Sequence, residues 1–132
     1  MTTEAIATTT IKFSDLPALG ADFEGGKFAG LTTRKDGTHA AVILLPHVAT
    51  ELTWKKAMTW AKKLNAELPS RPVASLLFAN LKSDLRPQWH WTSEEFDASY
   101  AWLCGFNSGG TINSHKSYEG SAVAVRLIPV TA

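Results

Sequence analysis

The hydrophobic period of this 132-residue chain changes at Pro87, and this change limits the possible folds more than any other feature. Between Thr53 and Arg86 apolar residues recur at the helical spacing of about 3.6 residues. After Pro87 they alternate along the chain or run on without interruption, as they do in strands. A chain of this length forms one compact domain, so the helices and strands must share a core. Helices followed by antiparallel strands predict an α+β fold.

A strand pair is predicted before the helices. The run from Lys27 to Arg34 and the β-favourable run from Ala40 to Leu45 are separated by Asp36-Gly37. Asp-Gly accepts the positive φ angles that a two-residue hairpin turn requires. The sequence therefore predicts a hairpin with a two-residue turn, and it predicts that Pro46 ends the second strand.

Two helices are predicted in the middle of the chain. Thr53 is a good N-cap, and the helix after it has one broad apolar arc opposite a lysine face. Leu68-Pro69 ends this helix, Ser70 caps the next one, and Pro72 is tolerated in the first turn of the second helix. The arc consists of Trp54, Ala57, Met58, Trp60, Ala61 and Leu64, and the lysines are Lys55, Lys56, Lys62 and Lys63. The second, more buried helix carries Val73, Leu76, Leu77, Phe78 and Leu81 and ends near residues 82–86.

The C-terminal third is predicted to be β-structure. The strand from Tyr100 to Phe106 has no polar face, which is typical of a central strand. A turn at residues 107–110 leads into the polar stretch Thr111 to Lys116, which suits an edge strand or an exposed loop. The segment Ser121 to Pro129 is predicted as the last strand.

Composition disfavours several functional classes. Thirteen basic and twelve acidic residues leave a net charge of +1, far from the strong positive field of a dedicated duplex-binding protein. Because Cys104 is the only cysteine, the chain can form neither an intrachain disulfide nor a Cys-rich zinc site. The longest apolar run, Ala40 to Pro46, is far shorter than the ~20 residues that span a bilayer, so no membrane association is expected.

The N-terminal segment, residues 1–14, is polar and rich in threonine. It lacks the basic and then apolar order of a signal peptide, so we expect a cytoplasmic protein, or one that leaves the cell only by assembly or lysis. We expect this segment to be a flexible or partner-engaging arm that contributes little to the core, and residues 15–132 to form a single domain.

The residues that could carry catalysis favour structural roles. Cys104 lies between Trp102 and Phe106 on one face of an apolar strand, whereas a reactive thiol needs an electropositive, partly exposed site. The four histidines, His39, His47, His90 and His115, show no metal-ligand spacing. We therefore predict no catalytic residues, no metal site and no cofactor.

Two charged groups allow alternatives. Glu94, Glu95 and Asp97 could hold a calcium ion or act as paired carboxylates, but they lack the spacing of a calcium loop, and a solvated turn is the favoured reading. The lysine face of the first helix could contact phosphates or an acidic partner, but an ordinary solvated face is favoured.

Aromatic residues are concentrated near the C-terminus, interleaved with short polar side chains. Tryptophan and tyrosine offer rigid contact area, and Asn and Ser adapt their hydrogen bonds, so this mixture is typical of a recognition surface. The tryptophans Trp89, Trp91 and Trp102 favour packing roles. The surface role then falls to the segment from Asn107 to Glu119. The predicted ligand-binding residues are Asn107, Ser108, Asn113, His115, Lys116 and Tyr118.

Several short motifs, in their order and spacing, resemble the DUF1566 family, a set of small domains common in bacteria and in phage and prophage genomes. The motifs are Leu52-Thr53-Trp54, Leu68-Pro69-Ser70, Trp91-Thr92-Ser93, Ala101-Trp102 and Val125-Arg126-Leu127-Ile128, and the resemblance covers roughly residues 25–130. It implies a C-type lectin-like fold, with two helices packed on a mostly antiparallel mixed sheet. It also implies that the loops between the Trp-Thr-Ser and Val-Arg strands form the display surface.

The expected function is therefore a non-catalytic phage or prophage binding module that recognises a protein or glycan ligand through these loops. The alternative is an intracellular, phage-encoded interaction protein that inhibits a host factor, such as a defence system, through the lysine helix or the arm. These two hypotheses imply a virion-associated protein and a protein of the host cytoplasm, respectively. The polar segment Thr111 to Lys116 could also pair across a two-fold axis, so a homo-oligomer is possible.

Overall fold

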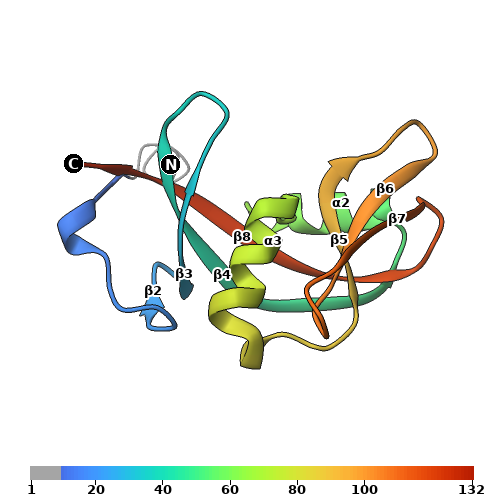
Figure 1. The fold of residues 1–132 in the computed structure, drawn as a ribbon, viewed down its shortest axis with the longest axis horizontal. Coiled ribbons are helices and arrows are strands. Elements are labelled where there is room, and N and C mark those ends of the chain that lie inside the picture. Colours follow the sequence, from blue (N-terminus) through green and yellow to red (C-terminus); the bar gives the residue numbers. More distant parts are fainter. Residues whose placement is uncertain (1–9) are drawn as a thin grey trace.

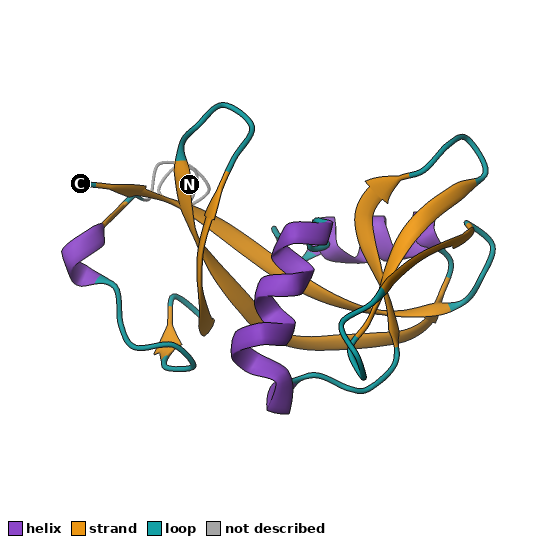
Figure 2. Ribbon diagram, in the orientation of Figure 1, coloured by secondary structure: helices purple, strands orange, loops and turns teal. Residues whose placement is uncertain are grey.

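The computed structural model describes residues 10–132, and in this range two α-helices pack on a mixed sheet of eight strands (Figures 1 and 2). The strand order is β2-β3-β4-β8-β5-β6-β7, and β1 pairs with β8 outside this path. Five of the strand pairings are antiparallel and two are parallel. The predicted α+β class and the mostly antiparallel mixed sheet are therefore confirmed. The strands are β1 (Ile11–Lys12), β2 (Asp22–Phe23), β3 (Gly26–Thr33), β4 (His39–Leu52), β5 (Trp89–Glu95), β6 (Tyr100–Gly105), β7 (Thr111–His115) and β8 (Gly120–Thr131).

Two long strands, β4 and β8, join the two halves of the molecule (Figure 1). The prediction that Pro46 ends its strand is wrong, because β4 continues to Leu52. Proline cannot donate to a strand ladder. The pairing with β8 is accordingly interrupted between Leu44 and Val48 and then resumes. Pro46 lies exposed in this irregular stretch.

The predicted hairpin is formed by β3 and β4, but its turn is longer than expected. Arg34 and Thr38 close the loop, and the Gly37 amide donates to the Arg34 carbonyl at 2.9 Å. Gly37 alone has a positive φ in this loop, +88°. This is a three-residue loop in which glycine occupies the left-handed position after a tight turn. The Asp36 side chain accepts hydrogen bonds from Thr38, and these bonds lower the pKa of the Asp36 carboxyl.

The two helices begin at the predicted caps. The Thr53 hydroxyl accepts a bond from the Lys56 amide at the start of α2 (Trp54–Lys63), and the Ser70 hydroxyl accepts one from the Val73 amide at the start of α3 (Arg71–Leu81). Each bond satisfies an amide that has no partner within its helix. Two short 3₁₀ turns, η1 (Phe13–Asp15) and η2 (Lys82–Asp84), complete the helical elements of the described chain.

The sheet has an apolar core on each face. Along β4, Ile43 packs with the α2 side of the molecule, whereas the neighbouring Val42 packs with the α3 side. In Figure 1, α3 lies in front of the long strands and α2 lies behind β5. Successive strand side chains point to opposite faces, so a strand covered on both faces needs a continuous apolar run. This requirement explains the uninterrupted sequence from Ala40 to Leu45.

The C-terminal strands have the predicted positions. β6 lies between β5 and β7, and β7 is an edge strand of the sheet. The bridge from β5 to β8 is a parallel pair between His90 and Ser121, and the Ser121 hydroxyl donates to the Gln88 side chain at 2.9 Å. The edge position of β7 leaves the outer side of this strand open to solvent.

The predicted arm is partly integrated into the sheet. Ile11 pairs in parallel with Val130 and is buried, so the described part of the arm makes a small contribution to the core through this residue. Residues 1–9 of the predicted arm lie outside the described residues.

Candidate functional site

The predicted ligand-binding residues follow β7 from one end to the other. Asn107 and Ser108 lie in the turn before the strand, Asn113 lies in its middle, and the remaining three lie at or just after its end. A five-residue strand is about 16 Å long, so Asn107 and Ser108 are separated by most of that distance from the three residues at the other end of the strand. All six are exposed except Lys116, which is half-buried. The structure therefore places them in a row along one sheet edge.

The turn at the start of this row rests on α3. Gly109 has a φ of +81°, and a Cβ atom there would lie 2.9 Å from the Phe78 ring. The Gly109 amide donates to the Gly105 carbonyl at 2.7 Å. Glycine is therefore required for both its conformation and its close approach, and it fixes the position from which Asn107 and Ser108 project.

Strand register builds a surface of rings beside this row. Tyr100 pairs with His115 and Trp102 pairs with Asn113, so these four side chains lie on the same face of the sheet. The rings of Tyr100 and His115 meet edge to face at 5.6 Å, and Phe96 meets Trp102 in the same way at 5.7 Å. We call Phe96, Tyr100, Trp102, Asn113 and His115 the aromatic platform.

Exposure in the platform differs from the sequence-based expectation. Phe96 is 55% exposed and Tyr100 is 40% exposed, although a surface role was predicted only for the segment from Asn107 to Glu119. The alternation of β6 places Tyr100 and Trp102 on one face, but the sequence does not show which part of that face a helix covers. Trp91, by contrast, is fully buried, and Trp89 and Trp102 are half-buried, in keeping with their predicted packing roles.

His115 presents a defined hydrogen-bond donor. Its Nδ1 accepts from the Ser117 amide at 3.1 Å and lies 2.7 Å from the Ser117 hydroxyl. An amide can only donate, so the neutral ring carries its proton on Nε2. The Nε2–H group is therefore left to donate to a ligand at the exposed end of the platform.

Lys116 and Tyr118 are engaged with the fold. The Lys116 ammonium pairs with Glu95, donates to the Ala98 carbonyl at 2.9 Å and lies 4.7 Å from the centre of the Trp54 ring. The Tyr118 ring meets the buried Trp91 ring edge to face at 6.1 Å. Lys116 therefore fastens the end of β7 to the rest of the domain, whereas Tyr118 keeps an exposed edge.

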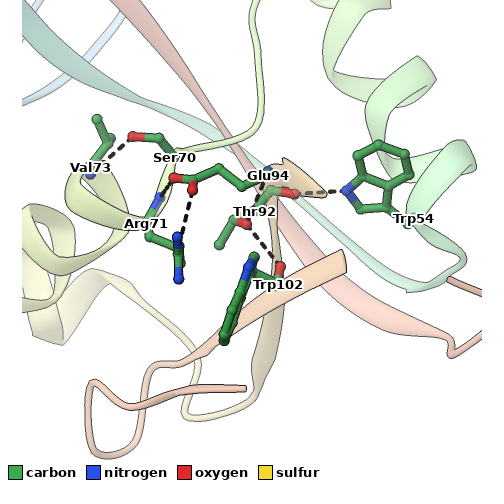
Figure 3. A network of polar contacts seen from close by, with 7 residues as sticks. All are labelled: Trp54, Ser70, Arg71, Val73, Thr92, Glu94 and Trp102. Atoms are coloured by element: carbon green, nitrogen blue, oxygen red, sulfur yellow. Dashed lines mark hydrogen bonds and ion pairs between the residues drawn. The ribbon is translucent and has the colours of Figure 1, made fainter. Parts of the chain in front are cut away.

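A polar network positions the start of α3 against β5 and β6 (Figure 3). The Glu94 carboxylate accepts from the backbone amide of Arg71 at 2.7 Å and from its Nε atom at 3.0 Å. The Arg71 guanidinium lies 4.2 Å from the centre of the Trp102 ring. A second branch runs through Thr92, whose hydroxyl donates to the Trp102 carbonyl at 2.9 Å and whose carbonyl accepts from the Trp54 indole at 2.9 Å. These contacts hold Trp102, a member of the platform, against β5 and the start of α3.

The acidic cluster is used within the fold. Glu94 binds Arg71, Glu95 pairs with Lys116, and Asp97 accepts from the amides of Ser99 and Tyr100 at 2.8 Å. Within residues 10–132, no group of three His, Cys, Asp or Glu side chains is arranged to hold a metal ion. The three carboxylates shape the β5–β6 connection.

Cys104 is packed in the core, as predicted. It is a cross-strand partner of His90, and both side chains are fully buried. Burial raises the pKa of the Cys104 thiol, which disfavours the nucleophilic thiolate. This part of the sheet offers a substrate no access to the sulfur atom.

His90 is a buried side chain in which one ring nitrogen lacks a hydrogen-bond partner among the described residues. Its Nδ1–H donates to the Gln88 carbonyl at 2.8 Å, and its ring lies 4.6 Å from Phe106, but Nε2 has no hydrogen-bond partner in the described chain. Burial, and to a lesser extent the Arg86 charge, lowers the pKa of the His90 imidazole below 6.5. The neutral ring is therefore the form that the folded protein holds.

This shift predicts a loss of stability in mild acid. Below pH 6.5 the unfolded chain binds a proton at His90 that the folded chain resists, so the free energy of unfolding falls as the pH falls, by at most about 1.4 kcal/mol per pH unit from this group. We expect urea unfolding between about pH 7 and 5.5, above the range where most carboxylates titrate, to show this slope. His90→Leu is expected to flatten it, whereas the same change at the exposed His47 is expected to keep it. An equal slope in wild type and His90→Leu would contradict this assignment.

A groove of about 1000 Å³ lies beside the platform. It is lined by residues 32–35 at the end of the β3–β4 hairpin, by the start of α3, by residues 93–95 of β5, and by Thr111 and Leu127. Arg71 and Glu94 of the network in Figure 3 lie in this groove. Thr111 begins β7, so the groove adjoins the predicted ligand-binding row.

The sequence matches no protein-family model, and no curated protein matches it. None of the helices between residues 10 and 132 is both long and apolar enough to cross a membrane.

Proposed function

We propose that this chain is a non-catalytic binding module of phage or prophage origin that recognises a protein or glycan ligand through the segment from Asn107 to Glu119. The observation that carries the proposal is the aromatic platform, which spans β6 and β7. Rings held by edge-to-face contacts lose little freedom on binding, and the adjacent Asn113 amide and His115 Nε2–H supply directional hydrogen bonds.

The rigidity of the platform's support favours binding. The Thr92 and Glu94 bonds tie β5, β6 and α3 together, and Lys116 fastens the end of β7. Sites on such a framework are ready for a ligand without a costly rearrangement. The C-type lectin-like fold and the DUF1566 relationship are part of this proposal, and they rest on the motif order together with two helices on a mostly antiparallel sheet.

The test is a triple substitution, Asn113→Ala, His115→Ala and Tyr118→Ala. A panel of purified bacterial surface polysaccharides and outer-membrane proteins would be screened by biolayer interferometry with the wild-type protein. We expect the triple variant to bind its ligand at least about 30-fold more weakly, since a few central aromatic and polar side chains carry most of the energy of an interface. Its melting temperature should fall only modestly, because all three side chains are exposed and the one packing contact that is lost is the edge of the Tyr118 ring on Trp91.

The matched control replaces Lys55, Thr59 and Lys62, which are exposed on α2, with alanine. This control should bind like the wild type. Loss of binding in the control with retention in the Asn113, His115 and Tyr118 variant would assign binding to the lysine helix, as in the alternative hypothesis. A panel with no binder at all would count against the proposed function.

A further inference from the structure

We propose that the groove between the β3–β4 hairpin and β7 binds an anionic oligosaccharide, whose carboxylate groups lie near Arg34 and Lys35. This inference rests on the proposed binding function and names the ligand class. It follows from the charge, the hydroxyl content and the size of the groove.

The charged side chains that line the groove carry a net positive charge. Arg34, Lys35 and Arg71 line the groove together with Glu94 and Glu95, which leaves one excess positive charge. Both carboxylates are already neutralised, Glu94 by Arg71 and Glu95 by Lys116 from outside the groove. Within the described residues, neither Arg34 nor Lys35 forms an ion pair. The Asp36 and Glu67 carboxylates interact electrostatically with Arg34, but neither lines the groove, so the excess positive charge of the lining lies on its hairpin side.

Arg34 is held in position for this role. Its Nη2 donates to the Leu127 carbonyl at 3.1 Å, which anchors the guanidinium to β8 and leaves other N–H groups free to bind. A guanidinium fork binds carboxylates through paired, charge-assisted hydrogen bonds. Lys35 follows it at the exposed tip and adds a second positive charge.

The rest of the lining matches a sugar. Six of the fourteen lining residues carry hydroxyl groups, namely Thr32, Thr33, Ser70, Ser75, Ser93 and Thr111. Hydroxyls both donate and accept, as sugar hydroxyls do. The Ser70 hydroxyl already accepts from the Val73 amide and the Thr33 hydroxyl lies 3.0 Å from His39 Nδ1, but each keeps further hydrogen-bonding capacity for a sugar. The apolar side chains of the lining are Pro72, Val73 and Leu127. The groove volume of about 1000 Å³ is large enough for several sugar units.

The test uses tetragalacturonic acid as the probe and its full methyl ester as the uncharged control, measured by isothermal titration calorimetry. The acid is expected to bind at least about tenfold more tightly than the ester, and its affinity is expected to fall between about 50 and 300 mM salt. The double variant Arg34→Ala with Lys35→Ala should lose this preference. The double variant Lys55→Ala with Lys56→Ala removes the same charge from α2 and should retain it.

Because Arg34 also contacts β8, Arg34→Gln with Lys35→Gln serves as a second variant that retains polar side chains at the tip, and it too should lose the preference. Equal binding of acid and ester, or no binding of the acid at millimolar concentration, would overturn the inference. If an octaglutamate peptide bound more tightly than tetragalacturonic acid, the assigned ligand class would be an acidic peptide and the oligosaccharide assignment would be wrong. A further outcome separates the groove from the β7 surface. If the triple variant at Asn113, His115 and Tyr118 still bound tetragalacturonate, and if the panel contained no other ligand, the result would support binding in the groove and contradict the proposed role of β7.

Discussion

Trp91→Ala is expected to lower the free energy of unfolding by about 4 kcal/mol. The Trp91 side chain is the largest of those that are fully buried in the described chain, and it packs in the core on the α2 side of the sheet. Its indole N–H also donates to the Leu52 carbonyl at 2.8 Å, which links β5 to the end of β4. The substitution therefore leaves both a cavity and a carbonyl without its partner. Equilibrium urea unfolding measures the loss.

Trp91→Phe separates these two effects. Phenylalanine fills most of the space but cannot donate to Leu52, so we expect a smaller loss of about 1.5 kcal/mol. A loss below about 1 kcal/mol for Trp91→Ala would contradict the buried position of this ring, because truncation of a packed tryptophan costs several times more.

Gly26→Ala is expected to cost about 3 kcal/mol, although it adds a single methyl group. A Cβ atom at Gly26 would lie 2.3 Å from the Leu44 carbonyl oxygen and 2.8 Å from the Ile43 Cγ2 atom. The closest obstacle is backbone, so β3 must move away from β4 to accommodate the methyl group. This movement would strain the pairing of Lys27 with Leu44 and the Lys27–Asp84 ion pair.

Gly110→Ala is the matched control. The nearest atom to a Cβ at Gly110 is the Ser108 hydroxyl oxygen at 3.7 Å, which is ordinary contact, and its φ lies outside the left-handed region. This variant should change stability by no more than about 0.5 kcal/mol. Equal unfolding midpoints for the two variants would show that β3 and β4 are not as close at Gly26 as the structure has them.

Local signals in the sequence were sufficient for most elements. The caps at Thr53 and Ser70 act through side chains within three residues of the amides they satisfy, so they could be read directly from the sequence. The central position of β6 followed from its two apolar faces. The prediction at Pro46 failed because pairing with β8 resumes beyond the proline and continues the strand. The turn at Asp36-Gly37 is one residue longer than predicted because Gly37 takes the left-handed position of a three-residue loop, which is closed by a hydrogen bond between Arg34 and Thr38.

The site was less accessible from the sequence. The row along β7 could be predicted because its residues are contiguous in the chain. The platform depends on the register between β6 and β7, which pairs Tyr100 with His115, and register is set by the whole sheet. The groove depends on long-range contact between the hairpin and α3, so neither Arg34 nor Arg71 was identified as a site residue.

Lys116 shows most clearly which site contacts could not be predicted from the sequence. Its exposed, polar sequence neighbourhood favours a ligand contact, yet its ammonium is occupied by Glu95, the Ala98 carbonyl and the Trp54 ring. These partners are 21, 18 and 62 residues away along the chain. Only the folded arrangement shows that this charge supports the sheet edge.

The most direct test of the account is an NMR titration of ¹⁵N-labelled protein with the ligand that the panel identifies. The largest amide shift changes are expected at Asn113, His115 and Tyr118 and in the turn at Asn107, with the exposed lysine face of α2 unchanged. Shift changes centred on Lys55, Lys56 and Lys62, with β7 silent, would contradict the claim that this sheet edge is the recognition surface.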